Sequence, residues 1–360
     1  MTFWDSFWNL AIPMGLILAV VGISQGTVAY LILVERKIAA WAQDRIGPNR
    51  VGPFGLIQPL VDGAKMILKE DVTPKYVSTP VYILAPAIAI IAAMIGFAVV
   101  PFGPVGASAP ILPFLDRRLD FQIAPNVDIG ILYILSIGSL GVYGVILAGW
   151  ASNSKYSFIG GLRSSAQLIS YEIPLGMSIL GMVLLAGSLD LNAIVNWQDR
   201  HVWGVFAQPI GFLLFLIAGF AETNRLPFDL PESEQELVGG FHTEYSAMKF
   251  GMFFLGEYLH VITVSFLITI LFLGGWDLPF LLDQNQTGWI PALAKVAVVC
   301  GKVGFLIIFI MWIRWTLPRF RYDTLMDLAW KRMIPLALVN LTLTAIIVYA
   351  LREWVGLKFA

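Results

Sequence analysis

Residues 250–275 read FGMFFLGEYLHVITVSFLITILFLGG, and this stretch contains a single charged side chain, Glu257. A bilayer core of roughly 30 Å is crossed by about 20 consecutive apolar residues in a helix. The stretch therefore predicts a membrane-spanning helix, although burying an ionised carboxylate in hydrocarbon is costly. We expect a helical, membrane-embedded fold that holds an acidic group inside the bilayer.

Similar apolar runs occur along the whole chain, which is 58% hydrophobic and only 13% charged over 360 residues. Charged residues make up about a quarter of an ordinary soluble domain. No internal repeat or low-complexity linker interrupts the runs, so we predict one polytopic all-α integral membrane domain, residues 1–360, with about eight transmembrane helices. The predicted spans are 11–34, 82–100, 127–150, 166–188, 204–222, 250–275, 295–315 and 334–352. Small residues within the spans predict close helix packing, as at Gly138, Gly141 and Gly144.

The composition excludes several kinds of cofactor site. A lone cysteine, Cys300, excludes a disulfide framework and a self-contained iron–sulfur cluster, which needs about four cysteines. The three histidines lie too far apart in sequence for a local metal-binding motif. No P-loop is present, and no glycine-rich turn follows a strand. We therefore expect no metal, redox centre or nucleotide bound by this chain alone, and no nucleic-acid partner.

The basic residues are distributed unevenly between alternate loops. The loops at 35–81, 151–165, 223–249 and 316–333, with the span ends beside them, hold 16 Lys and Arg, whereas the opposite side holds five. The positive-inside rule assigns the basic side to the cytoplasm and both termini to the outside. The absence of Lys and Arg before Arg36 favours a retained first helix over a cleaved signal peptide.

The first basic loop is predicted to contain an amphipathic helix. Apolar residues recur at helical spacing between Ile57 and Leu68, and Asp62 and Lys65 fall on the opposite face. Such a helix lies at the membrane surface. It is either a surface anchor or a cover whose polar face closes over a cavity, and Asp62 and Lys65 are spaced to pair with each other.

The loop at 222–249 is unusually acidic for the basic side of the protein. Only Arg225 and Lys249 oppose its six carboxylates. A solvated connector is one interpretation, but apolar residues between the acids favour burial, and Pro227 and Pro231 stiffen the path. We therefore expect a packed loop. Its acids are Glu222, Asp229, Glu232, Glu234, Glu236 and Glu244.

Two acids, Glu172 and Glu257, lie inside predicted spans. At 1.5 Å per helical residue, both are expected on the order of 10 Å beneath the cytoplasmic surface. A carboxylate at this depth indicates a functional site facing the bundle interior; the alternative is a structural pair with a basic residue. With Glu35, Glu222 and the acidic loop, they are predicted to form a polar chain from the surface toward mid-membrane. The expected counter-charges are Arg314, Arg319 and Arg321.

Two further titratable residues lie within the spans. His260, one turn beyond Glu257, is either a core histidine or a proton relay. Lys302 is a weaker relay candidate. The residues alone thus indicate a charged half-channel that opens to the cytoplasm.

Several strings of this sequence, taken jointly, resemble the family of H-type membrane subunits of proton-pumping NADH:quinone oxidoreductase, respiratory complex I. The resemblance covers essentially the whole chain. The strings are Glu35-Arg-Lys, Arg45-Ile-Gly-Pro-Asn-Arg-Val-Gly-Pro53, Asp62-Gly-Ala-Lys65, Lys69-Glu-Asp71, Ser170-Tyr-Glu172, the Ala221-to-Glu236 loop and Gly256-Glu-Tyr258.

The resemblance implies a function that the residues alone do not. Members of this family form the membrane side of the quinone chamber and begin the chain of charges that couples quinone reduction to proton translocation. Quinone is then the substrate, and iron–sulfur clusters and FMN reside in partner subunits of the peripheral arm. Other membrane-arm subunits and lipid are further partners, in a bacterial inner (cytoplasmic) membrane. The residues implied for the quinone chamber are Glu35, Arg36, Asp62, Ala64 and Lys65. Those implied for proton coupling are Glu172, Glu222, Arg225, Asp229, Glu232, Glu234, Glu257 and Arg314.

Two other functions remain open at this point. One is a free-standing ion or solute transporter, for which inverted repeats or paired broken helices are expected; the sequence shows neither. The other is the homologous subunit of a hydrogenase- or ferredoxin-linked complex. Copurifying subunits would distinguish all three.

Overall fold

The computed structural model describes residues 3–112, 118–125, 127–231, 234–278 and 288–355. These residues form helices and loops, and they contain no β-strand beyond an isolated bridge between Ile111 and Arg118. The predicted all-α class is confirmed. The helices are α1 (Phe3–Ala42), α2 (Gln58–Leu68), α3 (Thr79–Ile95), α4 (Gly130–Ala151), α5 (Lys155–Ala186), α6 (Leu191–Arg200), α7 (Gly204–Ala207), α8 (Pro209–Glu222), α9 (Glu234–Leu237), α10 (Ala247–Phe272), α11 (Trp289–Thr316), α12 (Tyr322–Asp327) and α13 (Ile334–Val355).

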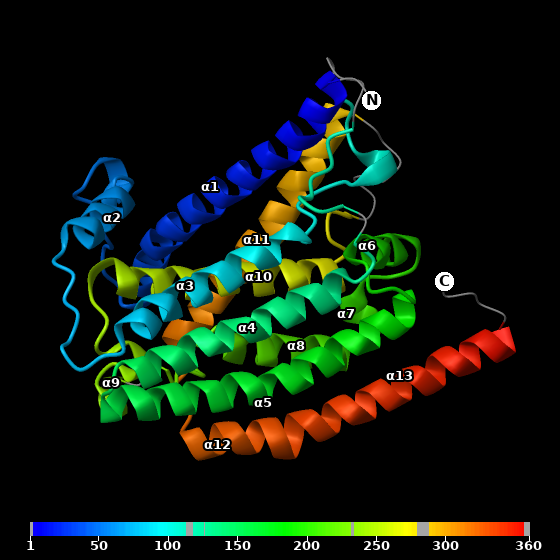
Figure 1. Ribbon diagram of the computed structural model, residues 1–360. Helices are drawn as coiled ribbons and strands as arrows, with labels where there is room; N and C mark the ends of the chain where they lie inside the picture. Colours follow the sequence, from blue (N-terminus) through cyan, green and yellow to red (C-terminus); the bar gives the residue numbers. More distant parts are fainter. Residues whose placement is uncertain (1–2, 113–117, 126, 232–233, 279–287, 356–360) are drawn as a thin grey trace.

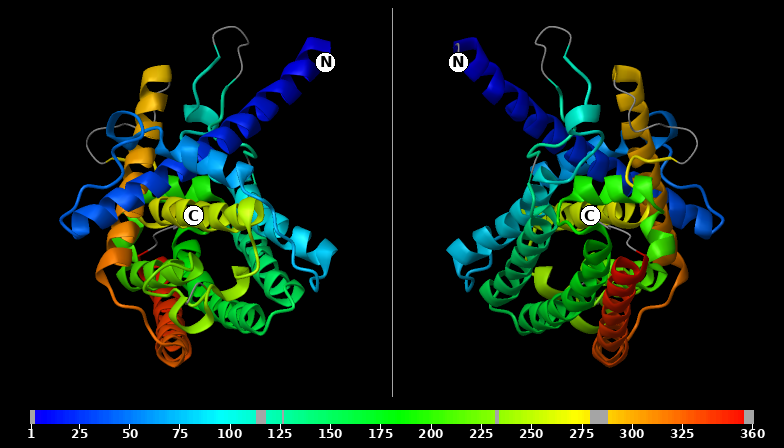
Figure 2. Two further views of the ribbon diagram at one scale, coloured as in Figure 1. Left: turned by 90° about the vertical axis from the view of Figure 1, so that its left-hand side faces the viewer. Right: turned by 90° about the vertical axis from the view of Figure 1, so that its right-hand side faces the viewer.

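Within the described residues, seven helical segments are long and apolar enough to cross a membrane. They are α1, α3, α4, α5, α10, α11 and the continuous run from α12 through α13. In α10, 83% of the apolar segment is buried, against 17% in α1 and in the α12–α13 run. Figure 2 accordingly shows α10 in the middle of the bundle, with α1 projecting at one edge and α13 at the opposite edge. The expected multi-pass membrane architecture is confirmed.

The span predicted at 204–222 is interrupted. α7 ends at Ala207, α8 begins at Pro209, and Gln208 between them has φ −136° and ψ 62°. The helix breaks here because helical geometry is disfavoured for a residue that precedes proline. The 14 residues of α8 reach about 21 Å, short of the roughly 30 Å bilayer core. α8 is therefore a short helix packed against α5 and α10.

Other predicted spans differ from the helices mainly in their ends. The span expected at 166–188 corresponds to α5, which begins at Lys155, and the span expected at 11–34 corresponds to α1, which reaches Ala42. Hydropathy marks only the part of a helix that suits hydrocarbon, whereas backbone hydrogen bonding continues into the polar interface. The extra turns carry polar residues to the ends of the bundle.

α1, α4, α8 and α11 all finish on one side of the bundle, where α2, α9 and α12 also lie (Figure 1). We call this side the basic end; it comprises residues 35–81, 151–165, 223–249 and 316–333. The beginning of α1 and the end of α13 lie on the opposite side in Figure 1. This arrangement brings residues distant in sequence to the basic end.

Candidate functional site

Four side chains of alternating charge lie next to one another at the basic end. Glu35 of α1 is buried; it accepts a hydrogen bond from the Tyr258 hydroxyl of α10 and pairs with Arg314 of α11. Guanidinium nitrogens of Arg225 lie 3.9 Å from Glu35 Oε1 and 3.5 Å from Glu257 Oε2. The order is Arg314, Glu35, Arg225, Glu257, which we call the charge row.

Arg225 is 3% exposed, so its charge needs compensation from the protein. Besides the two carboxylates, two aromatic rings of α10 surround it. The guanidinium carbon lies 4.2 Å from the ring centre of Tyr258 and 5.3 Å from that of Phe254. Cations are attracted to aromatic faces at such distances. The neighbours of Arg225 thus suit a permanently charged guanidinium.

The loop after α8 is held in place by Gln167 of α5. The Gln167 amide nitrogen donates to the carbonyls of Ala221 and Phe228, each at 2.7 Å, on either side of Arg225. Phe228 and Leu230 are buried. The prediction that the loop is packed is therefore confirmed for this part, and the packing directs Arg225 toward α10.

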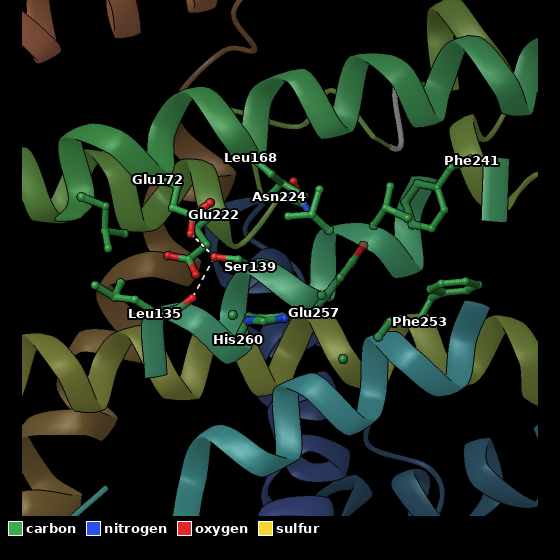
Figure 3. Close-up of a pocket in the computed structure, with 17 residues that line it drawn as sticks. Leu135, Ser139, Leu168, Glu172, Glu222, Asn224, Phe241, Phe253, Glu257 and His260 are labelled. Carbon is green, nitrogen blue, oxygen red and sulfur yellow. Dashed lines mark hydrogen bonds between the residues drawn. The ribbon is translucent and has the colours of Figure 1, made fainter. Parts of the chain in front are cut away.

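An internal cavity of about 60 Å³ lies on the inner side of the charge row. Glu257 lines it together with Glu172 of α5 and Glu222 at the end of α8. Figure 3 shows the Glu172 and Glu222 carboxylates directed toward each other, with the Ser139 hydroxyl hydrogen-bonded to Glu172. The two carboxylates therefore face the same small space from α5 and α8. The cavity is large enough for a few water molecules.

A second, larger cavity of about 370 Å³ lies at the other end of the row. Glu35 and Arg314 line it, with Arg36, Arg45 and apolar groups that include Ile32, Phe254 and Trp315. We call this the outer cavity and the smaller one the inner cavity. Glu35 borders the outer cavity, Glu257 borders the inner one, and Arg225 lies between these two acids.

The predicted amphipathic helix is confirmed as α2. Asp62 does not pair with Lys65 as its spacing suggested; it accepts from Arg36 at 2.6 Å and from Gln58 at 2.9 Å. Ala64 and Lys65 are exposed. Arg36 therefore links α2 to the rim of the outer cavity, while the other polar face of α2 points away from the chain.

Glu236 of the acidic loop forms ion pairs apart from the charge row. Glu236 pairs with Arg163 at 2.5 Å and with Arg319 at 3.5 Å, and it is largely exposed. Asp229 is half-buried. Glu232 lies outside the described residues, as does the side chain of Glu234, whose backbone begins α9. Among the predicted counter-charges, Arg314 forms an ion pair with Glu35, and Arg319 forms one with Glu236.

Lys302 is held at the far end of α10, on the side opposite the basic end. Its ammonium donates to the carbonyls of Leu273, Gly275 and Asp277 at 2.6, 2.9 and 2.6 Å. A cation at a helix C-terminus is favourable because the carbonyls carry partial negative charge. These contacts show that Lys302 caps the end of α10, and its relay role stays a prediction.

Sequence reasoning overlooked Gln167 and Ser139, which orient the loop and Glu172. Both are polar residues inside apolar spans, and that is the signal by which they could have been found. Among the described residues, no group of three or more His, Cys, Asp or Glu is arranged to hold a metal ion.

The fold and site define a multi-pass helical membrane protein with a buried charge row between two cavities. The chain belongs to the NADH dehydrogenase family, whose model matches residues 14–345.

Its relatives include the H-type subunits of NADH-quinone oxidoreductase from several bacteria. The protein of Leptospira biflexa is 48% identical over 356 residues, covering 97% of this chain and 99% of its own length. That of Protochlamydia amoebophila is 51% identical over 320 residues, covering 88% and 91%. That of Geobacter metallireducens is 49% identical over 316 residues, covering 88% and 90%. The family resemblance inferred from the sequence is confirmed.

Proposed function

We propose that this chain is the membrane subunit of an NADH:quinone oxidoreductase in a bacterial inner membrane. It forms part of the quinone chamber and couples quinone reduction to proton translocation. In this proposal the chain is one domain, and its basic end faces the cytoplasm. Iron–sulfur clusters and FMN belong to peripheral-arm partners, and other membrane-arm subunits and lipid surround the helices. The names of the relatives support the oxidoreductase assignment.

The outer cavity is the proposed membrane side of the quinone chamber. It offers guanidinium donors from Arg36 and Arg45 beside apolar walls, which suits a ring with carbonyl acceptors and an apolar tail. α2 borders this cavity through the Asp62–Arg36 pair. Ala64 and Lys65 are exposed on α2 and do not line this cavity, so their assignment to the chamber rests on the family resemblance.

The coupling proposal depends on one observation, the position of Arg225 between Glu35 and Glu257. At separations of 3.9 and 3.5 Å, the two attractions are about 4 and about 5 kcal/mol at an effective dielectric constant of 20. Because they are similar, a charge that develops in the outer cavity can shift Arg225 from one acid to the other. Glu257 would then gain or release a proton to the inner cavity, where Glu172 and Glu222 lie. Asp229, Glu232 and Glu234 are the proposed surface end of this path.

The test uses Glu257→Gln and Glu172→Gln in the assembled complex. An amide keeps the shape of the carboxyl group but cannot carry a proton, so we expect NADH:quinone turnover or proton pumping to fall while the complex still assembles. Glu236→Gln is the matched control, since Glu236 is a largely exposed acid of the same loop. Normal turnover and normal proton-to-electron ratio in both buried variants would refute the coupling role.

Copurification tests the remaining alternatives. An NADH:quinone oxidoreductase requires peripheral subunits that carry FMN and iron–sulfur clusters in the purified complex. A chain that purifies and transports alone would indicate a transporter, and hydrogenase or ferredoxin-linked partners would indicate the related complex.

A further inference from the structure

His260 is the one titratable group at the inner cavity that the coupling proposal leaves without a function. It lies on α10 one turn after Glu257 and lines the same cavity. In the part of the chain that the structure describes, neither ring nitrogen of His260 forms a hydrogen bond with a protein group. Polar groups inside proteins are normally satisfied by the protein or by bound water. We therefore expect the hydrogen-bond partners of the His260 ring to lie in the inner cavity.

Two glycines of α4 line the cavity, one beside the ring of His260 and one beside Glu222. A Cβ atom at Gly141 would lie 3.6 Å from His260 Nε2, and a Cβ at Gly138 would lie 3.7 Å from Glu222 Oε1. Gly144, in contrast, packs against α3, where a Cβ would lie 3.0 Å from the Ala85 carbonyl. The expected close helix packing is thus confirmed at Gly144. Gly138 and Gly141 instead line the inner cavity, next to Glu222 and His260.

Figure 3 shows the ring of His260 between Glu257 on one side and the Glu172–Glu222 pair on the other. A cavity of about 60 Å³ accommodates a few water molecules, and each buried water needs two to four polar partners. The imidazole nitrogens, the carboxylates and Asn224, which also lines the cavity, supply them.

Charged groups from several elements surround the cavity that holds this ring. Within the charge row, Arg314 and Arg225 offset Glu35 and Glu257. Glu172 and Glu222 add negative charge from α5 and α8, and Ser139 faces them from α4. An imidazolium at this position would compensate one of these carboxylates, as opposite charges within a low-dielectric site do.

We infer that His260 is a proton-binding residue of the inner cavity, joined by bound water to Glu257 and to the Glu172–Glu222 pair. This inference rests on the proposed coupling function. A proton leaves the carboxyl group of Glu257 through water and adds to a ring nitrogen of His260, and the imidazolium then releases a proton through water to the Glu222 carboxylate. Each transfer converts one acid into its conjugate base, so no other reactant is needed.

The first test is a map of the whole complex at a resolution that shows water. We expect a water peak within hydrogen-bond distance of a His260 ring nitrogen and a second peak that continues toward Glu222. A dry inner cavity, or water that contacts the carboxylates but not His260, would overturn the inference whatever the variants do.

The second test is His260→Asn, because an amide still hydrogen-bonds water but does not bind a proton near neutral pH. We expect pumping-linked turnover to fall by about tenfold, less than the hundredfold or more typical of a direct general acid or base, because water keeps a bypass open. The pH–rate profile should also lose one titration step. The matched control is His201→Asn, at a histidine beyond the opposite end of the bundle that stacks on Trp197.

The two proposals fail in different ways. If Glu257→Gln and Glu172→Gln impair coupling while His260→Asn behaves as His201→Asn does, the His260 inference is wrong and the coupling function stands. If the glutamate variants pump normally, the coupling function itself is wrong. If His260→Asn prevents assembly of the complex, the turnover of His260→Gln and the positions of bound water decide whether the His260 inference is correct.

Discussion

Removing Arg225 offers the sharpest test of the charge row. Arg225→Met keeps a long apolar side chain beside Tyr258 and Phe254 but leaves the buried Glu257 without its cation. A charge 3.5 Å away contributes about 5 kcal/mol at an effective dielectric constant of 20. Removing one partner of a buried pair typically costs about 3–5 kcal/mol. We therefore expect poor assembly of the complex.

The double variant Arg225→Met/Glu257→Gln removes both charges together. Removing both partners of a buried ion pair destabilises a protein far less than removing one of them. The double variant should therefore assemble better than Arg225→Met alone. Turnover should stay low, since the path through Glu257 is lost. Native gels report assembly, thermal denaturation of the purified complex reports stability, and NADH:quinone assays report function.

The exposed pair Arg163–Glu236 supplies the control cycle, with Arg163→Met, Glu236→Gln and the double variant. Its carboxylate is 47% exposed, so the coupling there should not exceed about 1 kcal/mol. Strictly additive effects in the Arg225–Glu257 cycle, equal to those of the surface cycle, would show that the two buried residues do not act as a pair.

Three further variants test other parts of the structure. Ala64→Trp adds bulk to the exposed face of α2, so the apparent KM should rise more for a long-chain quinone than for a short-chain analogue; equal changes would place α2 away from the chamber. Lys302→Met removes hydrogen bonds to three carbonyls beyond α10 and should destabilise the protein by about 1–3 kcal/mol, measured by thermal denaturation, while the proton-to-electron ratio stays normal. Gln167→Leu frees the carbonyls of Ala221 and Phe228, so hydrogen exchange of residues 221–230 should accelerate; unchanged exchange would mean that the apolar packing of Phe228 and Leu230 alone holds the loop.

The sequence by itself determined the membrane class, the helical architecture and the presence of acids inside it. These features depend on local properties: the length of an apolar run, its periodicity and the polarity of its residues. The amphipathic helix at 58–68 was predictable for the same reason. The break at Gln208 was also present in the sequence, since Pro209 follows it, but hydropathy averaged over 204–222 concealed it.

Only the tertiary structure decided which charges meet. Glu35, Arg225, Glu257 and Arg314 come from four separate segments, and an ion pair depends on distances that no spacing along one helix fixes. Asp62 shows the same limit, because it pairs with Arg36 from another helix instead of Lys65 on its own. The cavity beside His260 is likewise lined by residues of several helices, among them Gly138 and Gly141 of α4. Such gaps arise from how whole helices pack against one another, so they are properties of the assembled bundle.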